Sequence, residues 1–152
     1  MGLRDRFTDA MKEAMKTKQV KRLGTIRMIL AAVQERCIAA RVDALPEDEI
    51  LGLLGKMIKQ REESAATYES GGRPELAAGE REEITVIREF MPRQLSPEET
   101  RSAVAEAIAT TGAASLKDMG KIMAALKERH AGSMDFGKAS AAVKELLATP
   151  KA

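Results

Sequence analysis

The chain has 152 residues and a formal net charge of +2 at pH 7, with 44% hydrophobic and 32% charged residues. This is the composition of a soluble protein with one moderate core or two small ones. Aromatic residues make up only 3% of the chain, and the strong helix formers Ala, Leu, Glu, Lys, Arg and Met are abundant, so an all-α fold is expected. No apolar run approaches the about 18 residues of a membrane span, and the N-terminus lacks the apolar centre of a signal peptide.

The charge is unevenly distributed along the chain. Residues 4–41 carry 10 Lys or Arg and 4 Asp or Glu, a net +6, whereas residues 42–91 carry 6 and 12, a net −6. Two interpretations follow, and both can hold at once. Either basic helices pack beside acidic helices and exchange ion pairs, or a basic face is directed at a polyanion.

The first two helices are predicted over residues 3–16 and 20–41, where apolar residues recur every three or four positions. Gly24 lies inside the second helix and weakens it, so a close helix crossing is expected there. Cys37 continues the apolar stripe of this helix and is interpreted as a small core residue. As the single cysteine, it rules out an internal disulfide and favours a reducing compartment, with the cytoplasm as the default.

The third helix is predicted to begin after Pro46 with three acidic residues, which complement the positive end of the helix dipole. Its inward stripe includes one charged residue, Arg61, and Gly71 ends it. A fourth helix is predicted over about 74–90. Together these four helices are expected to form an antiparallel bundle over residues 1–91.

A domain joint follows the fourth helix. Pro92 ends that helix, because the residue before a proline is displaced from the α region. A short linker, 92–95, leads to Ser96, which with Glu99 three residues later makes the pattern of a capping box. The sequence therefore predicts a second, three-helix subdomain over residues 96–149, near the lower size limit for independent stability.

Glycines divide this tail into three helices. Gly112 and Gly132 are predicted to turn the chain, and Ser115 is predicted to cap the sixth helix. Gly120, inside that helix, is interpreted as a close-packing position. A large side chain there would then force the helix away from its neighbour.

The residues predict no catalytic, cofactor or metal site. The one histidine, His130, ends the sixth helix, where a cation favours the helix dipole. Gly120-Lys121 lacks the upstream glycine and the following Ser or Thr of a phosphate-binding loop. The plentiful carboxylates stand beside arginines at surface spacing, without the burial or like-charge contact that moves a catalytic pKa.

The strongest functional signal is a basic cluster at the junction of the first two helices. Its members are Lys12, Lys16, Lys18, Lys21, Arg22 and Arg27. Side chains that converge at one end of a helical bundle can neutralise the phosphates of a nucleic-acid backbone. Aromatic residues for base stacking do not accompany the cluster, and solvated helix ends often have this composition.

Several segments carry a family resemblance: RLGTIRMILAAVQ, GGRPELAAGEREEITVIREFMP, QLSPEE, TGAASLKDMGKIMAALK and MDFGKASAAVKELL. FMPRQLS and MGKIM are the most specific pieces. With them the chain resembles the GatB/YqeY family over nearly its whole length. The resemblance implies an all-helical fold of four plus three helices, in agreement with the helix count above. A similar tail ends the B subunit of the glutamine-dependent tRNA amidotransferase and helps to hold tRNA.

The resemblance implies a stand-alone relative of a tRNA-engaging module, since this chain has no counterpart of that subunit's kinase-like domain or of its partner's amidase machinery. It also implies candidate RNA contacts in the tail: Lys117, Gly120, Lys121, Lys127 and Gly137. Three functions remain open: a non-catalytic module that binds tRNA or another RNA, a protein-interaction module, or an amidotransferase component that is active only in a complex. The last would be a carbon–nitrogen ligase with glutamine as amido-N-donor. No cofactor and no membrane partner is expected.

Overall fold

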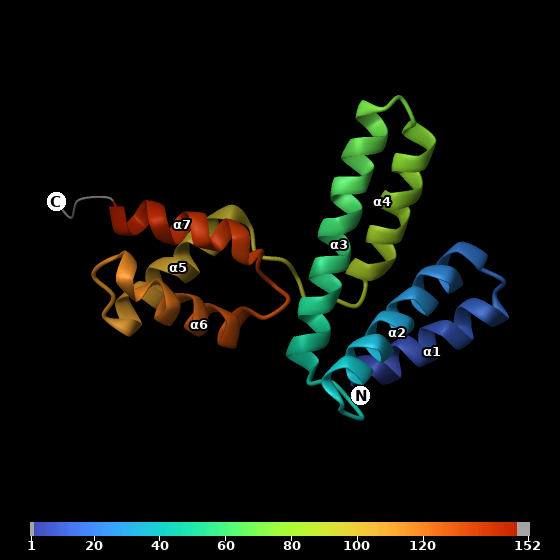
Figure 1. Ribbon diagram of the computed structural model, residues 1–152, viewed down its shortest axis with the longest axis horizontal. Helices are drawn as coiled ribbons and strands as arrows, with labels where there is room; N and C mark the ends of the chain where they lie inside the picture. Colours follow the sequence, from blue (N-terminus) through green and yellow to red (C-terminus); the bar gives the residue numbers. More distant parts are fainter. Residues whose placement is uncertain (1, 149–152) are drawn as a thin grey trace. The chain divides into compact units, whose positions relative to one another are not determined.

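The computed structural model describes residues 2–148, and these form α-helices without any strand (Figure 1). The helices are α1 (Leu3–Lys16), α2 (Val20–Ala40), α3 (Glu47–Ser70), α4 (Pro74–Arg88), α5 (Pro97–Thr111), α6 (Met119–His130) and α7 (Phe136–Ala148). A 3₁₀ turn, η1 (Leu116–Asp118), precedes α6. The predicted all-α class is confirmed, and the chain divides after Pro92 into two compact units.

The first unit consists of two antiparallel helical hairpins, α1–α2 and α3–α4, and the α3–α4 hairpin packs against α2 (Figure 1). Its core lies at this contact, where side chains such as Phe7, Ile29, Leu54 and Ile87 are fully buried. Phe7 packs edge-on against Phe90, with the ring centroids 4.9 Å apart. The four helices do not run side by side over their full lengths, because the outer half of α3–α4 extends past this core.

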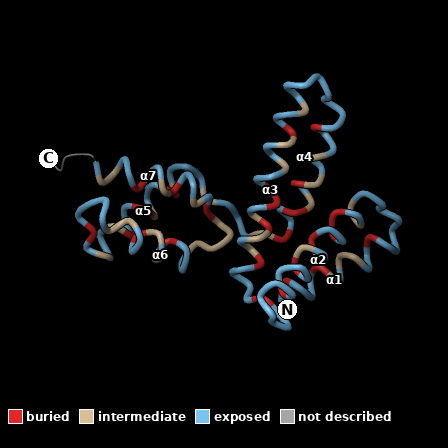
Figure 2. Tube along the Cα trace, viewed as in Figure 1, coloured by how far each residue is buried: buried red, intermediate tan, exposed pale blue. Residues whose placement is uncertain are grey.

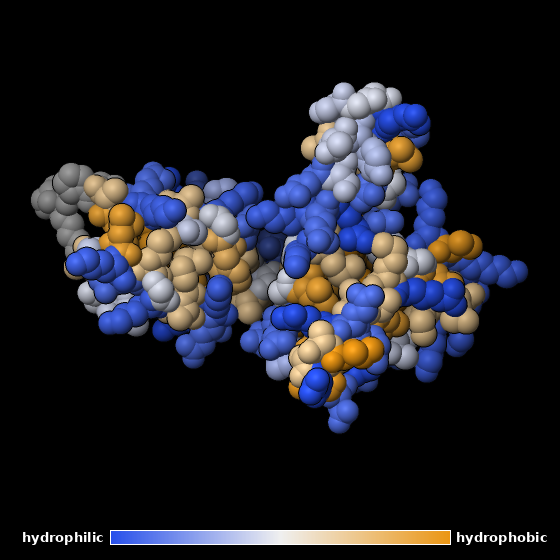
Figure 3. Space-filling model, in the orientation of Figure 1, coloured by the Kyte–Doolittle hydropathy of each residue, from blue (hydrophilic) through white to orange (hydrophobic). Residues whose placement is uncertain are grey.

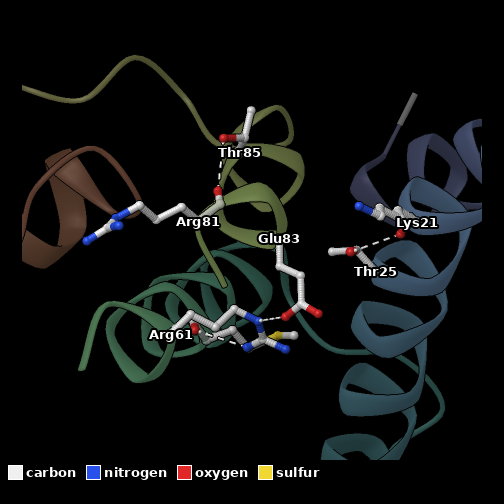
Figure 4. Close-up of polar contacts among 7 residues, drawn as sticks. Lys21, Thr25, Arg61, Arg81, Glu83 and Thr85 are labelled. Atoms are coloured by element: carbon white, nitrogen blue, oxygen red, sulfur yellow. Dashed lines mark hydrogen bonds and ion pairs between the residues drawn. The ribbon is translucent and has the colours of Figure 1, made fainter. Parts of the chain in front are cut away.

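Polar contacts bind the outer part of the α3–α4 hairpin. The Arg61 side chain is only 12% exposed; its Nε donates to Glu83 Oε2 at 2.8 Å and its Nη1 to the Met57 carbonyl at 3.1 Å (Figure 4). Two more ion pairs, Arg81–Glu69 at 2.6 Å and Arg88–Glu62 at 3.1 Å, link the same helices. Arg61 therefore faces inward, as its place in the apolar stripe predicts.

The second unit packs α5, α6 and α7 around a separate core that includes Val104, Ile122, Leu126 and Val143. Its entry is fixed by the predicted capping box: Glu99 N–H donates to Ser96 Oγ, and Ser96 N–H donates to Glu99 Oε1, both at 3.1 Å.

The predicted cap at Ser115 is wrong. The Ser115 side chain makes no capping bond; instead, Asp118 Oδ2 accepts from the Ala114 N–H at 3.1 Å. The chain enters α6 through η1, and neither Ser115 nor Asp118 makes a side-chain capping bond to these helices.

The packing predictions for Gly24 and Gly120 are also wrong. Both glycines are exposed, and a Cβ atom added to either one would meet nothing within 4 Å. No helix crosses closely at either position. Each glycine instead leaves the helix backbone open to solvent, at a cost of about 1 kcal/mol relative to alanine.

Within the described helices, none combines the length and the apolar character that crossing a bilayer requires. Among residues 2–148, His, Cys, Asp and Glu side chains nowhere gather in threes with a geometry suited to a metal ion. The second unit's last expected residue, 149, lies outside the described residues.

Candidate nucleic-acid interface

The turn between α1 and α2 presents the predicted basic cluster. Lys18 has a φ of +56°, a left-handed conformation that non-glycine residues rarely adopt. The reversal is held by backbone bonds from Thr17 N–H to Glu13 O at 2.9 Å and from Gln19 N–H to Ala14 O at 3.0 Å. These bonds close the hairpin tightly, so that the cations at the end of α1 and the start of α2 lie around one turn.

Two of the six predicted cations are ion-paired with the acidic helix α4 and the residue after it. Lys21 Nζ lies 3.3 Å from Glu82 Oε2, and Arg22 pairs with Glu89. The structure thus shows the ion pairing of basic with acidic helices that the charge distribution predicts. Lys21 remains 86% exposed, and such a solvated pair is worth little, so its charge is still open to a stronger anion.

The other four members of the cluster differ in position. Lys12, Lys16 and Lys18 are exposed and form no ion pair with any described residue. They lie at the turn or within about one helical turn of it. Arg27 is also exposed, but it lies two turns along α2 and on the outward face of that helix. The structure therefore groups the lysines and leaves Arg27 apart.

The second cationic surface lies on α6 and η1. Lys117, Lys121 and Lys127 are all exposed and form no ion pair with a described residue. Gly120 lies between them and is followed one turn later by exposed Ala124. Two small residues thus follow one another on the helix face near Lys117 and Lys121, and exposed Glu128 lies one turn further on, beside Lys127. A polyanion can approach the helix closely at the two small residues, because neither carries a long side chain.

Gly137 has a different environment from the other tail candidates. It opens the first turn of α7, where Asp135 Oδ1 accepts from the Gly137 N–H at 2.9 Å and from the Lys138 N–H at 3.2 Å. This backbone donor is already satisfied by a carboxylate, and Gly137 is a weaker candidate for an anion contact. Lys127 Nζ lies 6.0 Å from the ring centroid of Phe136, so the first residue of α7 makes a cation–π contact with this lysine.

Sequence reasoning missed a depression of about 420 Å³ between α3 and α4. It is lined by Glu62, Ala65, Ala66, Arg81, Ile84, Thr85 and Arg88. The two adjacent alanines of α3, Ala65 and Ala66, were the only signal in the sequence. Arg81 lowers the pKa of Glu69 at its border, first by hydrogen bonding and then by charge, which keeps that carboxylate ionised and unsuited to act as a general acid.

Cysteine and histidine most often carry nucleophilic or acid–base chemistry, and neither Cys37 nor His130 has an environment that would activate it. Cys37 is 3% exposed within the first core, as predicted for a packing residue. His130 is half-buried in the last turn of α6 beside Arg129, which pairs with Glu106. Among the described residues, the exposed lysines at the α1–α2 turn and on η1 and α6 remain the candidates for a binding surface.

Fold and surface together define a class: a helical protein of two compact units with lysine-rich surfaces. The comparisons identify the family. The sequence profile of the YqeY-like proteins matches residues 4–147, and the chain belongs to that family.

Curated relatives match about half of the chain. Three are similar to it, each named "Altered inheritance of mitochondria protein 41, mitochondrial". They come from Vanderwaltozyma polyspora (30% identical over 81 residues), Meyerozyma guilliermondii (32% over 83) and Clavispora lusitaniae (35% over 81). Each alignment covers 53% of this chain and 44%, 42% and 46% of the respective relative. The matched region thus spans less than half of those proteins.

Proposed function

We propose that this YqeY-like protein is a non-catalytic module that binds RNA, tRNA in the first instance, through its lysine-rich surfaces. The observation that carries the proposal is the α6 surface, where the exposed Lys117 and Lys121 lie on either side of Gly120 in the sequence and exposed Lys127 follows two helical turns later, none of the three with an ion-pair partner among the described residues. The lysines at the α1–α2 turn add a second contact. Lysine supplies charge without reading base sequence, so binding is expected to follow the phosphate backbone.

The resemblance to the tail of the tRNA amidotransferase B subunit also supports tRNA as the ligand. The same resemblance is also compatible with a different function, that of an amidotransferase component that is active only inside a complex. The buried free thiol of Cys37 supports a reducing compartment, for which we propose the cytoplasm.

A specific observation favours a protein-interaction module as the second candidate. Large apolar side chains are exposed on α2, among them Val20 at 77% and Ile38 at 67%. Exposed apolar surface of this kind marks interaction sites on soluble proteins.

The experiment is a titration of labelled total tRNA with the full chain at two salt concentrations. The triple variant Lys117→Ala, Lys121→Ala, Lys127→Ala is expected to weaken binding of all tRNAs alike. It should also flatten the slope of log affinity against log salt by roughly 0.7–0.9 for each phosphate that the variant no longer neutralises.

A second triple variant, with Lys16, Lys18 and Lys21 changed to alanine, measures the contribution of the α1–α2 turn. The matched control changes Lys56 and Lys59, which are exposed on α3 and belong to neither surface, and it should bind as the parent does. If the parent binds no tRNA at low salt, or if the control variant loses as much affinity as the other two, the proposal is wrong.

A further inference from the structure

Helix α2 buries apolar side chains on its inward face and also exposes several on its outward side. Its inward face supplies Ile26, Ile29 and Val33 to the core. On its outward side lie Val20 (77% exposed), Met28 (41%), Ile38 (67%) and, just past its end, Val42 (44%). Figure 2 shows exposed positions continuing along this helix, and Figure 3 shows hydrophobic surface over the α1–α2 hairpin. Large apolar side chains exposed along one helix are candidates for a contact surface.

The outward residues form one stripe. Val20, Gly24, Arg27, Ala31 and Ile38 follow one another at spacings of three, four and seven residues, which places them along one face of a helix. Large apolar residues lie at the two ends of the stripe. Between them, the small residues Gly24 and Ala31 alternate with the exposed polar side chains of Arg27, Gln34 and Glu35. Because Gly24 has nothing within 4 Å of an added Cβ, another helix can come close at this point.

We propose that this stripe binds the same stripe of a second copy of the chain, with the two α2 helices antiparallel and the two-fold axis at Ala31. The stripe is symmetric about that residue: Gly24 and Ile38 are each seven residues from it, and Arg27 and Glu35 are each four. Residues equidistant from the axis come level across an antiparallel pair, and every contact occurs twice. Ile38 of one copy then fills the open space beside Gly24 of the other.

Charge complementarity selects this occupant and this orientation. Arg27 and Glu35 are exposed, and neither forms an ion pair with a described residue. In the antiparallel pair, Arg27 of each copy lies level with Glu35 of the other, so two ion pairs form across the seam. In a parallel pair, Arg27 would instead face Arg27 and Glu35 would face Glu35, so like charges would repel. RNA does not fit the stripe, because Arg27 is its only cation and the carboxylate of Glu35 lies on the same side of the helix.

This proposal is independent of RNA binding. It gives Arg27 a role in self-association, whereas the lysines of the α1–α2 turn and of α6 are the proposed phosphate contacts.

The test is the mass of the full chain in solution, measured by light scattering over a range of protein concentrations. The parent should change from monomer to dimer as the concentration rises. Arg27→Glu and Glu35→Arg should each abolish the dimer, since like charges then face one another twice.

The double variant Arg27→Glu, Glu35→Arg should restore the dimer, because the exchanged charges pair again. Met15→Ser, which removes an exposed apolar side chain outside the stripe, is the control and should dimerise as the parent does. Circular dichroism verifies that each variant folds. A parent that stays monomeric at every concentration, single variants that still dimerise, or a double variant that stays monomeric would overturn the proposal.

A cross-link tests the position of the axis. Ala31→Cys places one thiol from each copy at the two-fold axis, and mild oxidation should give a covalent dimer. Ala39→Cys, which is exposed on α2 outside the stripe, is the control and should stay largely monomeric. The native Cys37 is buried and does not compete. Equal cross-linking of the two variants would place the interface elsewhere.

Discussion

At the scale of single residues, the entry to the second unit joins three side chains. Arg93 Nη1 and Nη2 donate to the two carboxylate oxygens of Glu99 at 2.9 and 2.7 Å, while Ser96 N–H donates to Oε1. The hydrogen bond from Arg93, followed by that from the Ser96 backbone, lowers the pKa of Glu99 to about 2. Glu99 therefore stays ionised far below the range in which an ordinary glutamate takes up a proton.

The expected result is a dependence of stability on acid. A lowered pKa in the folded state stabilises the fold above the unfolded-state pKa of 4.5, and this contribution is lost as the pH falls toward 2. An NMR titration of the Glu99 carboxyl group should show the low pKa, and Arg93→Ala should raise it. Arg101→Ala, which removes an ion pair with Glu145 instead, should leave that titration unchanged. An ordinary glutamate titration in the parent would contradict the predicted contact.

The residue scale also shows what local sequence can establish. The Ser96–Glu99 capping box was predictable, because its bonds join residues three apart. The bidentate contact from Arg93 was not, since it depends on the path of the linker. Gly24 and Gly120 were predicted wrongly because a helical glycine has two physical explanations, a close crossing or an exposed backbone, and only the neighbours in space decide between them.

At the scale of helices, periodicity predicted which face points inward but not which helix it meets. The stripe of α3 correctly included Arg61, yet nothing local identified Glu83 as its partner. Likewise, the apolar stripes of the first four helices are compatible both with a continuous bundle and with two hairpins that overlap over only part of their lengths. Packing partners depend on contacts between distant segments, which the spacing within one helix does not contain.

Arg61 is expected to matter more to the α3–α4 hairpin than any other arginine of α3 and α4. Arg61→Ala removes a charge-assisted hydrogen bond and the packing of a side chain that is only 12% exposed, which should lower the free energy of unfolding by roughly 1–3 kcal/mol. Arg88→Ala removes a solvated ion pair and should change it by about 1 kcal/mol or less. Urea denaturation measures both. If the two variants lowered the free energy of unfolding equally, the burial of Arg61 would contribute nothing to stability.

At the scale of the whole molecule, the proline and the cap around residue 92 led to the prediction of two subdomains, and the described residues form two separate hydrophobic cores. The cationic surfaces could be predicted as candidate residues, because charge is visible in the sequence. The exposed stripe of α2 was missed, because apolar residues on a helix are assigned to the core unless their exposure is known. The self-association inferred above therefore needed the structure.

Separate cores predict that a core mutation in one unit leaves the other intact. Ile87 is 0% exposed in the first core and Leu126 is 1% exposed in the second. Truncating either to alanine should cost its own unit about 2–5 kcal/mol. In a unit as small as the second, such a loss is a large part of the stability. Hydrogen exchange read by mass spectrometry should show faster exchange throughout α5–α7 for Leu126→Ala, with α1–α4 unchanged, and the reverse for Ile87→Ala. Faster exchange in both units from a single variant would mean that the two cores unfold as one.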